Sequence, residues 1–498
     1  MARVMGSEIE YGIIVAGEPN ANPMVASSHV VNSYGASNGL NRSPRWDFEE
    51  ESPLRDARGF EISRQLADPS QLTDEDLGLA NLILTNGARL YVDHAHPEYS
   101  SPECRSPIDV VRFEKAGDLV MARGAEIAHN VYELPEIILY KNNVDNKGAS
   151  YGAHENYLMH RQIPFHKVVA QLIPFFISRQ IILGAGRVGR GQESQESGFQ
   201  ISQRADYFEV QVGLETTLKR PIVNTRDEPH ADPKLHRRLH VIIGDANMSE
   251  TAIWLKMGTT ALVLDLIEAN ALPNPWEFVN PVKALHQISH DYEFKNVYEL
   301  EDGRKVTVFD IQERYLHAVK DFIEKNGADD EQRAIVATWE RILTTLKTDP
   351  MSLANELDWV AKLSLLNQYR ERDNLNWGSA KLSLIDLQYH DIRPEKGLYH
   401  KLVRANRMKT LVDPVQIETA VTEPPDDTRA YFRGKCLQKF GTSIAAASWD
   451  SVIFDLPGGG ALRRIPTLDP LRGTKSHVED LFEQHSSAEE FYNALTST

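Results

Sequence analysis

The ten residues RLYVDHAHPE, which begin at Arg89, constrain the fold more than any other segment of the chain. Side chains alternate between the two faces of an extended strand, so Arg89, Tyr91 and Asp93 would share one face. Leu90 and Val92 would share the other face and can enter a core. A row of a guanidinium, a phenol and a carboxylate is costly to bury without partners. The segment therefore predicts a strand whose polar face lines a cleft for a charged ligand.

The N-terminal segment VMGSEIEYG predicts a second strand with complementary charge. Glu8 and Glu10 would lie about 6–7 Å apart on one face, where they repel each other unless a cation is near. A divalent cation such as Mg2+ prefers oxygen ligands, and the guanidinium of Arg89 suits a phosphate. Candidate oxygen donors are Glu8, Glu10, Glu98 and Tyr91. Two edge strands with solvated polar faces would produce the same pattern, so the sequence alone leaves both interpretations open.

Length, charge and cysteine content narrow the class of protein. A chain of 498 residues has room for one large domain with a smaller one, or for three modest domains. The net charge of −17 argues against a nucleic-acid-binding protein, and no apolar stretch is long enough to predict a membrane span. Only Cys104 and Cys436 occur, which argues against a disulfide framework and favours the reducing cytoplasm.

The order of elements favours an α+β fold, because strands come first and helices are inserted without a βαβ alternation. Residues from about 35 to 80 lack a sustained period and predict a long insertion loop, whose Trp46, Phe48 and Phe60 are suited to docking. The cluster at 424–427 predicts a linker to a small C-terminal segment. Periodicity predicts helices from Pro107, from near His154, at 250–272 and at 309–346, and strands at 207–212 and 239–243.

Two tempting motifs lack the context that they need. Gly184, Gly186 and Gly189 match a dinucleotide-binding pattern, but a polar segment follows where a helix is required, so we favour a loop. His94 and His96 lack the spacing of a helical zinc site.

Isolated histidines and arginines leave more room for interpretation. His154 and His240 could each be structural or belong to a site. Arg204, Arg226 and Arg238 lie in or beside a strand-rich segment, and in a chain this acidic they favour an anionic ligand. We assign Arg204 and Arg226 to substrate binding.

Several longer motifs resemble the Pup ligase/depupylase family, in order along nearly the whole chain. They are GSEIEYG (6–12), NGARLYVD (86–93), HPEY (96–99), NTRDEPHAD (224–232), QYHDIRP (388–394) and ASWD (447–450). The resemblance implies a relative of glutamine synthetase and other carboxylate-amine ligases. Such a protein has a curved antiparallel sheet that cradles a nucleotide and Mg2+, packed with helices, and a small C-terminal domain. We accordingly expect a catalytic domain at 1–424 and a small domain at 425–498.

The resemblance also places the chain in one of the family's two branches. The turn between Asp93 and Glu98 is one residue shorter than in the ligases, and the insertion at about 35–80 resembles a loop that the ligases lack. Both features are similar to the hydrolytic branch, the depupylases or deamidases of Pup. Ser101 stands where the ligases have threonine, which keeps the hydroxyl.

Residue roles follow from the matched motifs. The resemblance implies that Asp93 is the catalytic carboxylate. The implied Mg2+ ligands are Glu8, Tyr91 and Glu98, and the implied nucleotide contacts are Arg89, Ser101 and Trp449. To the metal set we add Glu10, His154 and His240 from the strand pattern.

The implied activity is hydrolysis at one γ-carbonyl. The enzyme would convert a C-terminal glutamine of Pup to glutamate and cleave the isopeptide bond between that glutamate and a substrate lysine, with ATP or ADP and Mg2+ as cofactors. Expected partners are Pup, pupylated proteins and the proteasome system. An ATP-dependent Pup–protein ligase and a non-catalytic Pup-binding adaptor are the alternatives.

Overall fold

A central antiparallel sheet organises the computed structural model, which describes residues 3–40, 44–49, 51–63, 65, 67, 80–145, 148–189, 197–456 and 460–497. Its strands follow the order β15–β10–β1–β8–β7–β6, and all neighbours are antiparallel. They are β1 (Met5–Glu10), β6 (Asn81–Ile83), β7 (Arg89–Asp93), β8 (His96–Ser100), β10 (Ala153–His160) and β15 (His236–Val241). The two strands predicted from alternation are therefore confirmed as β1 and β7, with β8 between them.

The apolar face of this sheet enters the main core. Ile9, Leu90 and Tyr99 are fully buried and Val92 is nearly so, as the alternation predicts. Helices α1 (Pro23–Ser37) and α2 (Pro107–Asn130) pack on the sheet, and α4 (Glu250–Glu268) contacts β10. The helix predicted from Pro107 is thus confirmed, with the side chain of Ser106 accepting a hydrogen bond at its N-terminus.

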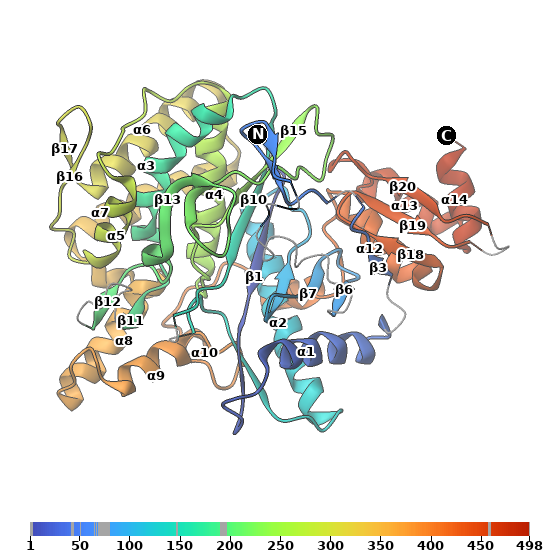
Figure 1. The fold of residues 1–498 in the computed structure, drawn as a ribbon, viewed down its shortest axis with the longest axis horizontal. Helices are drawn as coiled ribbons and strands as arrows, with labels where there is room; N and C mark the ends of the chain where they lie inside the picture. Colours follow the sequence, from blue (N-terminus) through green and yellow to red (C-terminus); the bar gives the residue numbers. More distant parts are fainter. Residues whose placement is uncertain are drawn as a thin grey trace.

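A helical layer lies on one side of the sheet, on the left of Figure 1. It contains α3 (Phe165–Leu183), α4, α5 (Pro281–His290), α6 (Val308–Asn326) and α7 (Asp330–Thr348). Further helices are α8 (Asp358–Asp373), α9 (Ala380–Tyr389), α10 (Leu398–Arg404) and α11 (Pro414–Ala420), with short 3-10 turns at Ala205–Tyr207 and Pro350–Leu353. The helices predicted at 250–272 and 309–346 are confirmed, the second as two separate helices.

A second hydrophobic cluster forms at the C-terminal end, on the right of Figure 1. Its helices are α12 (Ala430–Phe440), α13 (Lys475–Gln484) and α14 (Ala488–Thr496), with a 3-10 turn at Gly441–Ser443. They pack on a four-stranded sheet of β20 (Arg463–Pro466), β19 (Ser451–Phe454), β18 (Ile444–Ala447) and β3 (Arg45–Trp46). Because β3 comes from the N-terminal part of the chain, Trp46 belongs to this cluster.

The remaining strands form two-stranded sheets. They pair β2 (Gly12–Val15) with β9 (Ile137–Tyr140), β4 (Arg55–Asp56) with β5 (Phe60–Glu61), β11 (Arg187–Gly189) with β12 (Gly198–Gln200), β13 (Phe208–Gly213) with β14 (Arg220–Asn224), and β16 (Tyr298–Glu299) with β17 (Lys305–Val306). The strand predicted at 207–212 is confirmed as β13, and that at 239–243 overlaps β15. Gly189 ends a strand of an antiparallel pair, which differs from a dinucleotide-binding turn.

The helix predicted from near His154 is wrong. His154 lies in β10, whose residues are alternately buried and partly exposed, and the next helix, α3, begins at Phe165. Glu155 occupies a core position of this strand, where Arg179 binds its carboxylate through two hydrogen bonds of 2.9 and 2.6 Å. A buried charge on the core face hides the alternation that would reveal the strand.

The predicted insertion lies partly outside the described residues, since 41–43, 50, 64, 66 and 68–79 fall in it. Its described part includes the end of α1 and the short strands β3, β4 and β5.

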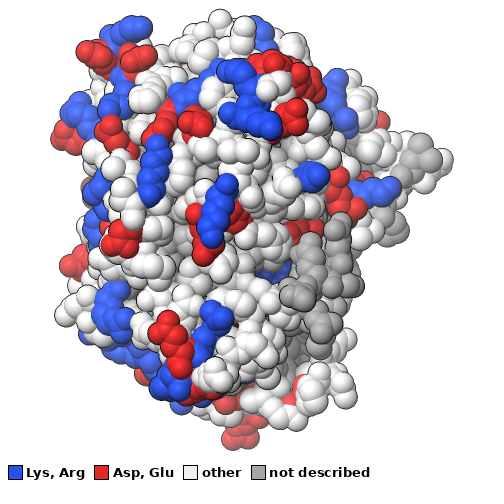
Figure 2. Space-filling view, turned by 90° about the vertical axis from the view of Figure 1, so that its left-hand side faces the viewer, with Lys and Arg blue, Asp and Glu red and all other residues white. Residues whose placement is uncertain are grey.

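Surface charge and helix composition add two further observations. On the face shown in Figure 2, acidic and basic side chains are interspersed. None of the helices in the described part of the chain is both long and apolar enough to cross a membrane.

Candidate active site

Strand register brings the predicted acidic residues together on the polar face of the sheet. In an antiparallel pair, directly opposed residues share a face. Glu8 faces His154 on one side and Ser100 on the other, and Glu10 faces Glu98. In the next pair, Glu98 also faces Tyr91. The same register places Asp93 opposite His96 and Asn156 opposite His240.

One cluster combines a carboxylate with two imidazoles. Ligand atoms of Glu8, His154 and His240 all lie within 4.8 Å of one another. Glu8 Oε2 is 3.3 Å from His154 Nδ1, and Glu8 Oε1 accepts a hydrogen bond of 2.9 Å from the side-chain amide of Asn156. Burial alone would raise the pKa of Glu8, but the bond from His154 and the charges near it, including Arg238, hold that pKa well below its usual range. Glu8 is thus a carboxylate that can bind a cation.

His240 completes this cluster as a neutral imidazole that can offer a lone pair to a cation. Burial, followed by the positive charge of Arg238, holds the pKa of His240 well below its usual value. Its ring therefore keeps a lone pair at neutral pH, and it packs edge-to-face on His154 with ring centroids 4.9 Å apart.

A second cluster consists of three carboxylates. Oxygen atoms of Glu10, Asp93 and Glu98 lie within 4.8 Å of one another. Burial and the charges of Asp93 and Glu10 raise the pKa of Glu98 well above its usual value. Glu10 accepts hydrogen bonds from the backbone of Gly152, at 2.7 Å, and its carboxylate is 3.3 Å from His96 Nδ1. Carboxylates held this close fit a site for a hard cation such as Mg2+, because such a cation prefers oxygen ligands and offsets the repulsion between them.

Asp93 stands at the end of β7 with His94 beside it. His94 Nδ1 lies 2.7 Å from Asp93 Oδ1, and His94 adopts a left-handed backbone conformation with φ 52°. Both residues line the polar cavity described below. The carboxylate therefore sits where it can meet a bound substrate.

Arg89 is buried but incompletely satisfied. Its side-chain Nε donates to Asn81 Oδ1 at 3.2 Å, and its Cζ lies 3.9 Å from the ring centre of Tyr91. Its buried Nη2 has no hydrogen-bond partner among the described residues. A buried guanidinium nitrogen without an acceptor fits an anionic ligand such as a phosphate.

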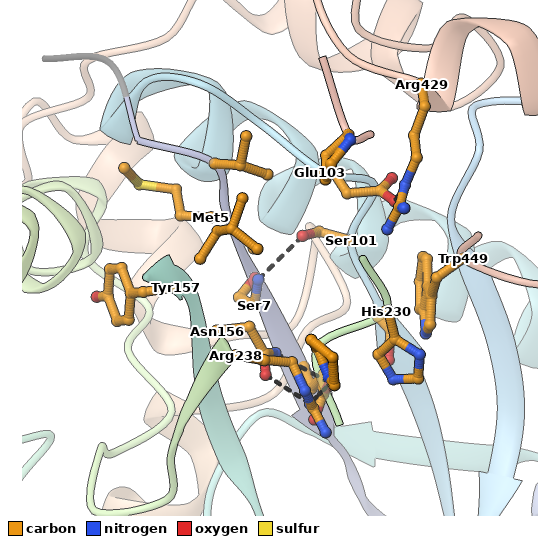
Figure 3. Close-up of a pocket in the computed structure, with 17 residues that line it drawn as sticks. Met5, Ser7, Ser101, Glu103, Asn156, Tyr157, His230, Arg238, Arg429 and Trp449 are labelled. Atoms are coloured by element: carbon orange, nitrogen blue, oxygen red, sulfur yellow. Dashed lines mark hydrogen bonds and ion pairs between the residues drawn. The ribbon is translucent and has the colours of Figure 1, made fainter. Parts of the chain in front are cut away.

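Two adjoining cavities open on the polar face of the sheet. The polar cavity is lined by Arg89 and Tyr91 and by most residues of the two clusters, namely Glu8, His154, His240, Asp93 and Glu98. The other cavity, drawn in Figure 3, is lined more by apolar groups, including Val4, Met5 and Pro470. The residues that line both are Glu8, Ser100, His230, Arg238 and Trp449. Together the cavities form a candidate ligand site with one charged and one apolar end.

Ser101 and Trp449 lie at the apolar end. Figure 3 shows Trp449 beside His230, across the cavity from Met5. The hydroxyl of Ser101 accepts a hydrogen bond of 3.0 Å from the backbone of Ser7 and donates to the carbonyl of Pro102. Two of the three predicted nucleotide contacts therefore line this cavity, although the Ser101 hydroxyl also ties β1 to the segment after β8.

The three arginines of the middle segment occupy different places. Arg226 and Arg238 line the polar cavity, and Arg238 lies 3.6 Å from Glu8. Arg204 is only 1% exposed and is not among the residues that line either cavity. Its guanidinium donates to Ser150 and to the carbonyls of Ile242 and Gly244. The structure thus brings Arg226 to the site and leaves Arg204 behind it.

Some lining residues were not predicted. His230, whose own backbone φ is 44°, lines both cavities, and Glu51 of the insertion lines the polar cavity. His230 lies within the motif at 224–232, where its neighbouring polar residues are a weak signal. Glu51 belongs to an acidic run that has the composition of a solvated segment.

The chain matches known proteins over its whole length. The family model described as Pup-ligase protein matches residues 3–453. A protein of Acidothermus cellulolyticus named depupylase is 60% identical over 500 residues, which cover 100% of this chain and 99% of that protein. A Pup deamidase/depupylase of Mycolicibacterium smegmatis is 54% identical over 499 residues, with 100% of each chain covered.

Solved structures agree on the fold. In the complex between the prokaryotic ubiquitin-like protein Pup and its ligase PafA, one chain matches with a TM-score of 0.81 at 31% identity, covering 100% of this chain and 94% of that one. The Pup ligase PafA in complex with ADP matches with a TM-score of 0.75 at 34% identity, covering 86% of this chain and 96% of that one.

Proposed function

This chain belongs to the Pup ligase family, and we propose that it is one of the family's hydrolases, a depupylase that also deamidates Pup. The observation that carries the proposal is sequence identity: 60% and 54% over the full length to proteins named as depupylases, against 40% and 38% over 81% of this chain to proteins named Pup–protein ligase. Its short turn after Asp93 points to the same branch.

Both reactions break one carbon–nitrogen bond at the same γ-carbonyl. In depupylation, water supplies the hydroxyl that joins the side-chain carbonyl carbon (Cδ) of Pup's C-terminal glutamate, and the proton goes to the departing lysine amine. In deamidation, the same carbon belongs to a C-terminal glutamine and the departing group is ammonia. A single site that places this carbonyl next to an activated oxygen serves both substrates.

Asp93 is the residue that we assign to this step. Its carboxylate lies in the polar cavity, with His94 2.7 Å from one oxygen. It acts either as the base that removes a proton from water, or as the nucleophile that forms an anhydride which water then opens. In both routes the departing amine must be protonated before or as the carbon–nitrogen bond breaks.

The cofactor proposal is a nucleotide, ATP or ADP, together with Mg2+. The related ligase structure in complex with ADP supports the nucleotide, as does Arg89 Nη2, which has no hydrogen-bond partner among the described residues. Arg89 would hold a phosphate of the nucleotide, while Ser101 and Trp449 would contact the nucleotide at the apolar end of the site. The ion would be held by residues from the two clusters and the phenol of Tyr91: Glu8, Glu10, Tyr91, Glu98, His154 and His240. When bound, Mg2+ would stabilise negative charge developing on the amide oxygen.

Substrate binding is assigned to Arg226, which lies on the wall of the polar cavity near Glu228, at 3.8 Å. A guanidinium there suits the α-carboxylate of the last residue of Pup. The same role for Arg204 stays a prediction from the sequence.

The finer architecture and the cellular setting are also proposals. We assign the antiparallel sheet to a glutamine synthetase-like cradle, with a catalytic domain at 1–424 and a small domain at 425–498; the separate C-terminal hydrophobic cluster supports this division. Pup and pupylated proteins are the expected partners, with a link to the proteasome system. Two free, buried cysteines are compatible with the cytoplasm.

The test separates the hydrolase from its rivals. The protein is incubated with Pup ending in glutamine, ATP and Mg2+, and ammonia and ADP are both measured. Release of ammonia without an equal amount of ADP supports the hydrolase. ADP formation coupled to a new bond between Pup and lysine would establish the ligase, and Pup binding without either reaction would establish an adaptor.

A further inference from the structure

Trp46, from the insertion, packs directly on the arginine that we assign to phosphate. The Cζ of Arg89 lies 4.1 Å from the centre of the Trp46 ring and 3.9 Å from that of Tyr91. Arg89 is 6% exposed, so this cation–π contact is shielded from water and correspondingly strong. Two rings and the Asn81 side chain thus restrain the guanidinium, while its Nη2 keeps no partner among the described residues.

Trp46 also contacts the other end of the site. Its ring meets that of Trp449 edge-to-face, with centroids 5.2 Å apart. Its indole N–H donates to Glu51 Oε1 at 2.6 Å, and Glu51 itself lines the polar cavity. One tryptophan therefore touches both Arg89 and Trp449, two residues assigned to the nucleotide.

The backbone beneath Trp46 is anchored on the C-terminal sheet. Strand β3 pairs in parallel with β18, where Trp46 is in register with Ala447. The backbone N–H of Asp47 donates to the Ala447 carbonyl at 3.0 Å, and the Asp47 carboxylate lies 2.7 Å from Arg464 Nη1. The ring is thus held by the same sheet whose β18–β19 turn carries Trp449.

We propose that Trp46 is a positioning residue for the nucleotide: it holds the Arg89 guanidinium so that Nη2 remains available to a phosphate. The inference deepens the proposed function and rests on its nucleotide site. It gives the insertion a direct part in cofactor binding, through a residue that does not itself need to touch the ligand.

A purely structural role for Trp46 makes different predictions. Trp46 is 5% exposed and belongs to the C-terminal hydrophobic cluster, so its truncation must also lower the stability of the protein. Phe491 provides the matched control, because it is fully buried in the same cluster and packs on Phe432, Phe440 and Phe482 rather than on Arg89.

The experiment measures the affinity of the full-length protein for MgADP by calorimetry, with the unfolding temperature and the steady-state kinetics of Pup–lysine cleavage. We expect Trp46→Leu to weaken MgADP binding by about 5- to 30-fold, the range of a shielded cation–π contact. The rate at saturating nucleotide should stay close to that of the wild type. Trp46→Phe, which keeps an aromatic face, should weaken binding by no more than about 3-fold. Phe491→Leu should lower the unfolding temperature without changing MgADP affinity.

The outcomes distinguish a failure of the role proposed for Trp46 from a failure of the proposed function. Wild-type affinity in Trp46→Leu, or an equal loss in Phe491→Leu, overturns the positioning role while leaving the hydrolase intact. If Trp46→Leu does not fold, Trp46→Met, which fills more of the space without an aromatic face, takes its place: MgADP affinity in Trp46→Met equal to that of Trp46→Phe overturns the role. A wild-type protein that binds no MgADP overturns the nucleotide site and this inference with it.

Discussion

His94 Nδ1 lies 2.7 Å from the Oδ1 atom of Asp93, the residue that precedes it. Adjacent residues of a regular strand point to opposite faces, so this contact requires the chain to leave the strand at once. The left-handed φ of 52° at His94 makes the turn, and β8 begins two residues later. The short connection between β7 and β8 thus keeps an imidazole beside the carboxylate that we assign to catalysis.

Replacing Asp93 by asparagine should abolish hydrolysis while sparing the fold. The amide can neither accept a proton from water nor form an anhydride, so we expect kcat to fall by about 10³-fold or more for both Pup reactions. Ammonia release from Pup-glutamine and cleavage of a Pup–lysine conjugate measure the loss. Asp302→Asn, which changes an exposed carboxylate paired with Arg304, should retain full activity. A normal rate in Asp93→Asn would remove Asp93 from the mechanism.

Chelation and a change in the carboxylate cluster should both act through the metal. We expect EDTA to stop hydrolysis and added Mg2+ to restore it. Glu98→Gln removes one of three carboxylates whose oxygens lie within 4.8 Å, and should raise the Mg2+ concentration for half-maximal activity by about 10-fold or more. Activity is measured against free Mg2+, with Glu136→Gln, an exposed carboxylate paired with Arg393, as the control. An unchanged Mg2+ dependence in Glu98→Gln would place the ion elsewhere.

Alternation in the sequence predicted the polar and apolar faces of β1 and β7 because each carries apolar residues on a single face. Leu90 and Val92 are buried, and the polar side chains of the same strand line the cavity. The partner strand β10 could not be predicted in this way, because Glu155 occupies the core face and its cost is offset by Arg179, from α3.

The contribution of the insertion depends on tertiary contacts that no local pattern encodes. Trp46 and Phe48 were expected to dock somewhere, but the partner of Trp46, Arg89, lies forty-three positions away in the chain. Arg204 shows the same dependence: its type suits an anion, and in the structure its guanidinium donates to the carbonyls of Ile242 and Gly244 and does not line either cavity. Residue type suggests a role, and only packing decides whether the side chain reaches the cavity.

Gly152 should tolerate no side chain, because it lies against two residues of the site. A Cβ atom added there would stand 2.5 Å from Glu10 Oε1 and 2.6 Å from His154 Nε2, closer than carbon can approach either atom. Gly152→Ala must therefore displace Glu10 or His154, and we expect a loss of activity of about 10- to 100-fold. Gly441→Ala, where no atom lies within 4 Å of the added carbon, is the control. Full activity in Gly152→Ala would show that these two side chains need not hold their positions.

Glu103 should make the stability of the protein depend on pH in the acidic range. The Glu103 carboxylate, whose side chain is 12% exposed, accepts a hydrogen bond of 2.7 Å from Arg429, the residue before α12, and another from Arg433 within that helix. Burial alone would raise its pKa, but the two guanidinium groups lower it from 4.5 to about 2. A carboxyl whose pKa is lower in the folded state stabilises the fold at pH above 4.5, and this contribution is lost as the pH falls towards 2.

Glu103→Gln should therefore reduce the free energy of unfolding by about 3–5 kcal/mol at pH 7, since it leaves two buried guanidinium groups without their counter-charge. The difference between wild type and variant should shrink as the pH is lowered from 5 towards 2, because the carboxyl of the unfolded chain takes up a proton near pH 4.5, whereas the folded carboxyl is neutralised only near pH 2. Urea denaturation at several pH values measures both effects. Glu293→Gln, in an exposed pair with Lys295, should change stability by less than about 1 kcal/mol at any pH. A difference for Glu103→Gln that stays constant with pH would mean that packing, rather than charge, joins Glu103 to α12.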